Sequence, residues 1–224
     1  MNTAAIEPHE LEARPVAPLQ AAGVGLWVFI GVASALFSLF LAAYIMRMVS
    51  PDWSSIALPG QLWLSTTLLI GGSVLMQAAA SSARRDEPAR TTALLWAGGL
   101  CAMAFLGAQL WAWSALQSAR VTLAGNPSAS FFYLLTALHG LHVLGGLIAW
   151  SLATRDIGPP KLAPGAAPDR AALAERAVAA AMRIRLCARY WHFLLAVWLL
   201  LYAALGNLTP EFVRYVCGIE APTR

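Results

Sequence analysis

Five long apolar stretches dominate this chain. Each lacks Asp, Glu, Lys and Arg, and each approaches the roughly 20 residues that a helix needs to cross the hydrocarbon core of a bilayer. Gly, Ala, Ser and Leu recur in them, without the alternation of apolar and polar residues that a membrane β-barrel requires. The pattern predicts an all-α polytopic membrane protein with five transmembrane helices, at residues 26–46, 62–80, 94–117, 130–153 and 191–208.

The remaining segments are an N-terminal arm, a linker and a C-terminal tail. The arm, residues 1–23, has three Glu and three Pro but neither a basic start nor an apolar core, so it does not resemble a cleavable signal. The linker before the last span begins Pro/Gly-rich and continues Ala-rich. The Ala-rich part predicts a cytoplasmic helix over residues 169–189, with Asp169 as its N-cap, that leads into the fifth span.

The tail, residues 209–224, has the spacing of a short amphipathic helix. Thr209 is a plausible N-cap and Pro210 suits the first turn. One apolar face follows the i, i+3, i+4, i+7 spacing, made of Phe212, Tyr215, Val216 and Ile219. We expect this face to dock on a neighbouring subunit; a helix lying on the lipid surface is the alternative.

Charge predicts the orientation of the chain. Only 12% of residues are charged, against about a quarter in soluble domains. With the N-terminus inside, the inner segments hold eleven Lys and Arg and the outer segments four, which follows the positive-inside rule. This bias accounts for the net charge of +4, so we do not expect nucleic-acid binding. The arm lacks the features of an organelle transit sequence, which indicates a bacterial inner membrane with the C-terminus outside.

The histidines are the candidate functional residues. His139 and His142 share a helix face in the fourth span, and His192 lies near the inner end of the fifth. From the residues alone three interpretations stay open: haem ligands of a stand-alone haem-b electron carrier, ligands of another metal, or structural hydrogen bonds between helices. The three cysteines show no metal-binding spacing, and free apolar thiols are the simpler interpretation. Because the spans hold no carboxylate for a proton relay, a subunit that supports a catalytic partner fits best.

Two segments carry a resemblance to a known family. FFYLLTALHGLHVLGGLIAW, residues 131–150, and YWHFLLAVWLLLY, residues 190–202, resemble the two most characteristic motifs of subunit III of the haem–copper terminal oxidases. LWVFIGVASALFSLFLAAY, residues 26–44, is loosely similar to the family's first conserved span. The order, the spacing and the five-span layout match the short bacterial members.

The resemblance implies a non-catalytic subunit of a proton-pumping cytochrome c oxidase. Such a subunit packs on subunit I in a complex with subunit II, on which cytochrome c acts, and it supports stability and proton uptake. It holds neither haem nor copper, so no catalytic or metal-binding residue is expected here. It binds phospholipid in a cleft, which we place in a two-plus-three bundle, between the first two helices and the last three. Candidate structural or lipid-cleft residues are His139, His142, Trp191, His192, Arg155, Arg185 and Arg189.

Three acidic residues of the family are missing here. Ala33, Leu195 and, less securely, Arg185 stand where the family has a buried Glu, an Asp and a second Glu. The departures argue against a role that depends on a carboxylate in this chain. Subunit III of a quinol oxidase and a homologue associated with nitric oxide reductase remain the alternative functions.

Overall fold

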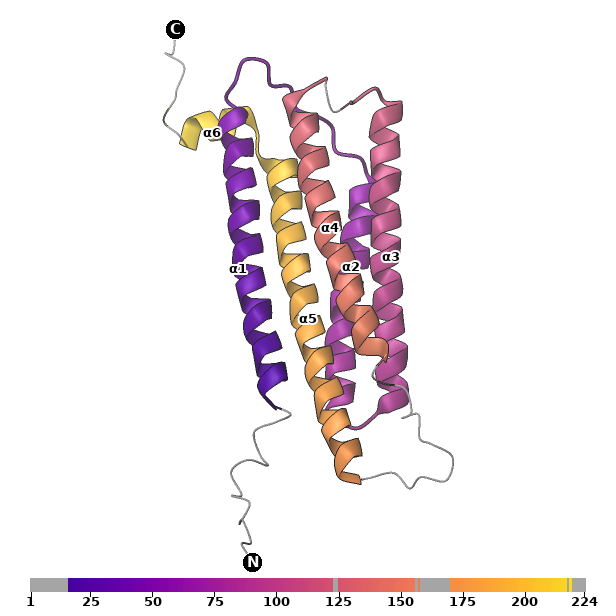
Figure 1. Ribbon diagram of the computed structural model, residues 1–224. Helices are drawn as coiled ribbons and strands as arrows, with labels where there is room; N and C mark the ends of the chain where they lie inside the picture. Colours follow the sequence, from indigo (N-terminus) through magenta and orange to yellow (C-terminus); the bar gives the residue numbers. More distant parts are fainter. Residues whose placement is uncertain (1–15, 123–124, 156, 158–169, 217, 219–224) are drawn as a thin grey trace, which may run out of the picture.

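The computed structural model describes residues 16–122, 125–155, 157, 170–216 and 218, and within them it is all-helical. Five helices are long and apolar enough to cross a membrane, which confirms the predicted fold class (Figure 1). They are α1 (Val16–Arg47), α2 (Gln61–Ala83), α3 (Pro88–Ser118), α4 (Pro127–Arg155) and α5 (Arg170–Asn207). A short sixth helix, α6 (Pro210–Val216), follows α5.

Local sequence signals set several helix ends. Pro88, Pro127 and Pro210 each begin a helix, where a missing N–H costs nothing. Arg120 takes a left-handed backbone conformation, with φ of 60°, just after α3, and Val121 N–H donates back to the Leu116 carbonyl. This ending satisfies carbonyls of the last turn that the helix itself leaves unpaired.

Helices α2, α3, α4 and α5 pack together as a four-helix unit, which we call the α2–α5 unit, and α1 packs on the outside of it. Helix α2 packs against α3 and α5, and α4 packs against α3 and α5, whereas α1 lies along α5 and α4 (Figure 1). Helices α1 and α2 share no extended contact. The predicted grouping of the first two helices against the last three is therefore wrong. The tight turn at residues 84–87 forces α2 and α3 together, and the longer connection at residues 48–60 leaves α1 free to pack elsewhere.

Close approach of helices depends on glycine most clearly at Gly99, where an added Cβ would lie 2.4 Å from the Trp150 ring. Packing is also tight at Gly146, where an added Cβ would lie 3.1 Å from the Leu194 side chain. The Trp150 indole lies in the space at Gly99 and donates from Nε1 to the Leu95 carbonyl at 2.7 Å. Small residues thus give the α2–α5 unit the close packing that stabilises helices in lipid.

One predicted boundary changes. Helix α1 begins at Val16, so residues 16–23 belong to the first helix and not to the N-terminal arm. The predicted linker helix leads into the fifth span without a break, and the two form one continuous helix of 38 residues, α5, because no Gly or Pro interrupts the Ala-rich stretch before Trp191. Residues 1–15 and Asp169, the predicted N-cap, lie outside the described residues.

Helix α6 packs on its own chain through a residue that the predicted face did not include. Val213 is buried against Tyr44 and Met48 of the α1 end, whereas Phe212 and Tyr215 are exposed. Thr209 Oγ1 accepts from the Phe212 N–H at 3.3 Å, which confirms the predicted cap. The side chain of Val216 and residue Ile219 lie outside the description. Docking of the exposed face on a neighbouring subunit stays a prediction.

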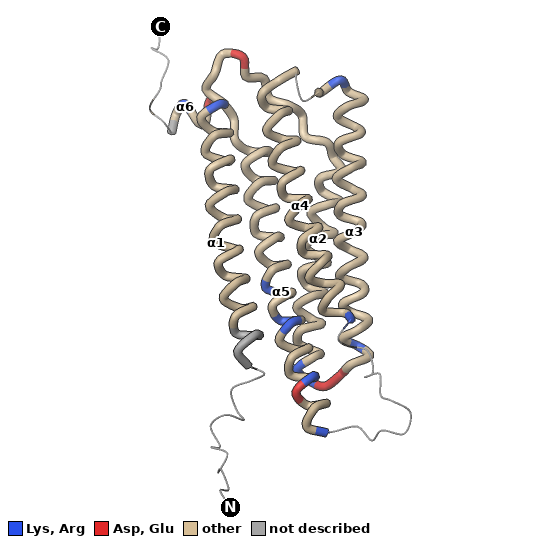
Figure 2. The backbone as a smooth tube through the Cα atoms, viewed as in Figure 1, with Lys and Arg blue, Asp and Glu red and all other residues tan. Residues whose placement is uncertain are grey.

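Arginines gather at one end of the bundle, the end at which α1 and α5 begin (Figure 2). We call it the basic end; its described arginines are Arg84, Arg85, Arg90, Arg155, Arg170, Arg176, Arg183, Arg185 and Arg189. The opposite end has Arg47, Arg120 and Arg214. The asymmetry between the two ends is the one that the sequence predicted.

Candidate functional site

His139 lies at the centre of the protein, inside a shell of aromatic rings. It is fully buried, and the ring centroids of Trp198 and Phe105 lie 5.3 and 5.7 Å from its own. Phe37 of α1 closes the shell at 6.4 Å. Neither ring nitrogen has a hydrogen-bond partner among the described residues. The site holds a neutral imidazole by packing rather than by a polar network.

His142 lies one turn further along α4, where α1 and α5 meet. Its Nδ1 donates to the Leu138 carbonyl at 2.7 Å, and the rings of Phe29 and Phe37 lie 5.8 and 5.1 Å away, centroid to centroid. The Tyr190 hydroxyl donates to the His142 carbonyl at 2.9 Å. The contacts join α1, α4 and α5, which is a structural role.

His192 belongs to a separate polar cluster between α2 and α5. Its Nδ1 lies 2.6 Å from the Ser73 hydroxyl oxygen and its Nε2 lies 3.0 Å from Gln77 Oε1. The histidine and the glutamine are both exposed. His139 and His192 therefore do not face each other, and the described residues offer no facing pair of the kind that a bis-histidine haem needs. No group of three or more His, Cys, Asp or Glu that could hold a metal ion occurs among the described residues.

The other predicted residues do not gather into one cleft. The prediction that Trp191 contacts lipid headgroups is wrong, because this side chain is fully buried in the core. Trp191 lies on the same face of α5 as Leu194 and Trp198, which also face inward. Arg155 ends α4 as an exposed side chain. Arg185 and Arg189 are exposed on α5, two turns and one turn before His192 respectively, on the same helix face.

A layer of polar contacts crosses the α2–α5 unit, and sequence reasoning had identified little of it. Trp198 Nε1 donates to Thr66 Oγ1 at 2.9 Å, which joins α5 to α2. Gln109 Nε2 donates to Ser65 Oγ at 3.1 Å, which joins α3 to α2, and Trp113 Nε1 donates to Thr136 Oγ1 at 3.1 Å, which joins α3 to α4. The signal was the presence of Ser, Thr and Gln inside spans that are otherwise apolar, since such side chains seek partners across helices.

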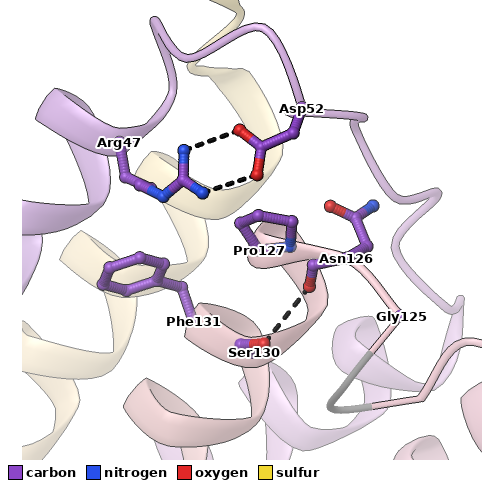
Figure 3. Close-up of a pocket in the computed structure, with 7 residues that line it drawn as sticks. All are labelled: Arg47, Asp52, Gly125, Asn126, Pro127, Ser130 and Phe131. Carbon is purple, nitrogen blue, oxygen red and sulfur yellow. Dashed lines mark hydrogen bonds and ion pairs between the residues drawn. The ribbon is translucent and has the colours of Figure 1, made fainter.

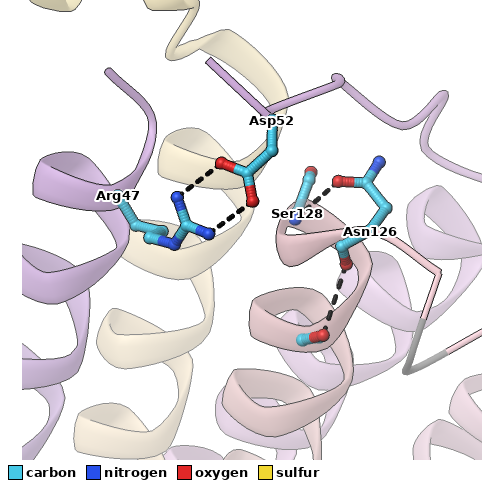
Figure 4. Close-up of polar contacts among 5 residues, drawn as sticks. Arg47, Asp52, Asn126 and Ser128 are labelled. Carbon is cyan, nitrogen blue, oxygen red and sulfur yellow. Dashed lines mark hydrogen bonds and ion pairs between the residues drawn. The ribbon is translucent and has the colours of Figure 1, made fainter. Parts of the chain in front are cut away.

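At the end opposite the basic end, a cavity of about 520 Å³ opens between the α1–α2 connection and the start of α4 (Figure 3). Arg47 and Asp52 meet at its rim in a two-pronged ion pair of 2.7 and 2.6 Å. Asn126 Oδ1 accepts from the Ser128 N–H at 3.0 Å and so caps α4 (Figure 4). The ion pair holds the pKa of the Asp52 carboxyl below its usual value, chiefly through the hydrogen bonds from Arg47. These contacts fix the connection to the helix ends.

The geometry defines a class of protein: a five-helix membrane protein whose polar side chains mainly join its own helices. Comparisons with known proteins make this specific. The chain is 26% identical to "Cytochrome c oxidase subunit 3" of Thermostichus vulcanus over 191 residues, which cover 83% of this chain and 87% of the relative. It is 29% identical to the protein of the same name in Synechocystis sp. over 189 residues, covering 80% of this chain and 72% of the relative.

A shorter match supports the same family. The chain is 30% identical to "Probable cytochrome c oxidase subunit 3" of Mycobacterium tuberculosis over 106 residues, which cover 47% of this chain and 45% of the relative. No family model matches the chain. These homologues, named cytochrome c oxidase subunit 3 and 26–30% identical to the chain, support a place for it in the cytochrome c oxidase subunit III family.

Proposed function

We propose that this chain is the non-catalytic subunit III of a bacterial cytochrome c oxidase that reduces oxygen to water and pumps protons. The observation that carries the proposal is the similarity to two proteins named cytochrome c oxidase subunit 3 along most of the length of each. The site supports it, because His139 and His142 are used in packing and the spans hold no carboxylate. The catalytic metals would then belong to partner subunits.

Purification from native membranes tests this function. A tagged chain is expected to bring down haem-containing partner subunits, and the complex is expected to oxidise reduced cytochrome c with consumption of oxygen. The isolated chain is expected to show no haem absorption. A haem band in the isolated chain that disappears in His139→Ala would instead identify a haem-b electron carrier. If the complex oxidises a quinol but not cytochrome c, the electron donor is a quinol and the complex is a quinol oxidase.

A second part of the proposal is phospholipid binding at the basic end. Arg185 and Arg189 are exposed on one face of α5, and Arg189 has no ion-pair or hydrogen-bond partner among the described residues. Arginine pairs readily with phosphate oxygens, and basic residues at the inner surface attract anionic headgroups. The bound lipid would stabilise the subunit and protect the oxidase during turnover.

Native mass spectrometry of the complex tests the lipid site. The double variant Arg185→Gln/Arg189→Gln is expected to lose a bound anionic lipid and to inactivate faster during turnover. Arg176→Gln is the matched control, because Arg176 is exposed on the same helix but on another face. Equal lipid retention in all three proteins would remove these arginines from the proposed site.

A further inference from the structure

Two side chains inside the α2–α5 unit carry buried polar atoms that have no hydrogen-bond partner among the described residues. These atoms are both ring nitrogens of His139 and the Oε1 atom of Gln109. His139 is fully buried, and Gln109 has 5% of its surface exposed. A buried polar atom without a hydrogen bond is costly and uncommon, so these atoms indicate a ligand that the polypeptide itself does not supply.

The two side chains lie at the same level of the bundle. The ring of Phe105 on α3 packs on His139, with centroids 5.7 Å apart, and Trp113, two turns further along α3, donates to Thr136 at 3.1 Å. Gln109 lies midway between Phe105 and Trp113, four residues from each, and therefore on the same side of α3. Its position on α3 is thus opposite the turn of α4 that runs from Thr136 to His139.

Hydrogen bonding determines which atom of the Gln109 amide is left without a partner. Ser65 Oγ lies 3.1 Å from Gln109 Nε2, and Ser65 donates its own hydroxyl proton to the Leu62 carbonyl at 3.0 Å. Ser65 can therefore only accept from Gln109, so the amide turns its NH₂ group toward Ser65 and its oxygen away from it. Gln109 Oε1 is a buried acceptor that needs a donor.

His139 also has an acceptor that needs a donor. Its ring is neutral, because a cation buried without a partner is far more costly, and a neutral imidazole has one N–H and one acceptor nitrogen. The faces of the surrounding aromatic rings can accept the N–H weakly. They offer no proton to the other nitrogen, since the N–H of the neighbouring Trp198 is already donated to Thr66 at 2.9 Å.

We propose that one water molecule is held between Gln109 Oε1 and the acceptor nitrogen of His139. Two acceptors cannot bond to each other, whereas a water donates one O–H to each and spans about 5 Å between them, at roughly 2.8 Å per bond. Internal waters are regular parts of proteins where buried polar groups converge. This water links α4 to the polar contacts of α2 and α3, and the inference stands apart from the proposed function.

Radiolytic footprinting of the full chain purified in detergent tests the water site. X-rays produce hydroxyl radicals from bound water, and these radicals oxidise adjacent side chains even where bulk solvent does not reach. Trp198, whose ring centroid lies 5.3 Å from that of His139, is the reporter. Trp150, whose N–H is bonded to the Leu95 carbonyl, is the internal reference. Oxidation of Trp198 is expected to exceed that of Trp150 severalfold, although Trp198 is less exposed, at 1% against 8%.

One variant and its control complete the test. Gln109→Leu removes one of the two acceptors and is expected to lower the oxidation of Trp198 to that of Trp150. Gln117→Leu makes the same change at an exposed position of α3 and is expected to leave it unchanged. Equal oxidation of Trp198 and Trp150 in the unmodified chain would overturn the inference and favour a direct bond from the His139 N–H to Gln109. Undiminished oxidation of Trp198 in a folded Gln109→Leu would overturn it as well. If Gln109→Leu does not fold, the comparison of the two tryptophans in the unmodified chain decides.

Discussion

Ala33 lies on the side of α1 that packs on the rest of the bundle. It stands where the resemblance to subunit III implies a buried Glu, and it lies midway between Phe29 and Phe37, whose rings contact His142. Ala33 is buried, with 3% of its surface exposed. In this chain, therefore, the buried position 33 carries no ionisable group, and aromatic rings surround the two histidines.

Carbodiimide labelling tests this substitution. The unmodified chain is expected to show no adduct between Leu26 and Met46, because that stretch contains no carboxyl group. Ala33→Glu introduces a carboxyl into an apolar surrounding, which favours the protonated form that the reagent attacks. Mass spectrometry is expected to find the adduct at position 33. If the Ala33→Glu variant folds normally and remains unlabelled, this position does not face the buried histidines.

Gly99 is the residue whose substitution the packing tolerates least. In Gly99→Ala the new methyl group would overlap the Trp150 ring, which is buried and hydrogen-bonded to Leu95. We expect a loss of about 1–3 kcal/mol in the free energy of unfolding in detergent. Gly107→Ala serves as the control, since no heavy atom lies within 4 Å of its added Cβ. Its stability is expected to be unchanged or higher, because alanine favours a helix. Similar losses in both variants would point to a general effect of the methyl group.

At the scale of single residues, the sequence predicted features that depend on adjacent residues in the chain. It did not predict features that depend on contacts with other helices. The cap at Thr209 follows from a local pattern of residue types and was confirmed. The burial of Trp191 depends on which side of α5 faces the core, and α5 is apolar on several sides. The partners of Ser65, Thr66 and Gln109 lie on other helices, at a register that the sequence does not encode locally.

At the scale of elements, α6 is held by a small contact. Val213 has 4% of its surface exposed and packs on Tyr44 and Met48. Val213→Asp would bury a carboxylate without a partner, so we expect α6 to detach at a cost of about 1–3 kcal/mol and to become sensitive to protease. Tyr215→Ser, at an exposed position, is expected to leave α6 attached. Detachment in both variants would mean that Val213 is not the anchor.

The Arg47–Asp52 pair makes the α1–α2 connection sensitive to acid. The folded-state pKa of Asp52 is lowered by hydrogen bonds from Arg47, so the stabilisation is complete above the unfolded-state pKa of about 4. It disappears as the pH falls through the lower folded-state pKa. The protection of residues 48–60 against hydrogen exchange, corrected for the intrinsic exchange rate at each pH, is expected to fall in that acidic range. In Asp52→Asn, residues 48–60 should be less protected at neutral pH and should show no further loss of protection in acid. An acid-dependent loss of equal size in this variant would mean that another group causes it.

Element boundaries were predictable in the middle of the spans and less so at their ends. Apolar length located all five spans, since a bilayer imposes that length on any helix that crosses it. The extension of α1 back to Val16 and the fusion of linker and span in α5 occur in helix-forming sequence outside the apolar core. Composition alone does not separate a membrane helix from its continuation in water.

At the scale of the whole molecule, the arginine asymmetry predicts the orientation in the membrane. We expect the basic end to lie in the cytoplasm. In a chain with Cys217→Ser, a membrane-impermeant maleimide applied from outside is expected to label Ser55→Cys, in the exposed α1–α2 connection. Arg85→Cys, in the turn between α2 and α3, is expected to react only after the membrane is opened. The reverse pattern would invert the orientation.

The arrangement of the helices was the part that the sequence could not provide. All the long helices are apolar on most sides, so their pattern does not say which sides meet. The resemblance suggested two groups of helices with a lipid cleft between them, whereas the contacts give a four-helix unit with α1 outside. What decided the packing was the length of each connection and the position of a few glycines.

The length of α5 gives this protein a mechanical property. A continuous helix of 38 residues measures about 57 Å, roughly 27 Å more than the hydrocarbon core it crosses. Residues 170–178 are exposed throughout, so the first turns of α5 project beyond the packed part of the bundle. Such a rod acts as a lever, because a tilt of about 10° in the membrane moves its free tip by about 5 Å. We expect a change of contacts within the bilayer to be converted in this way into a displacement on the aqueous side, and site-directed spin labels at the start of α5 would report it.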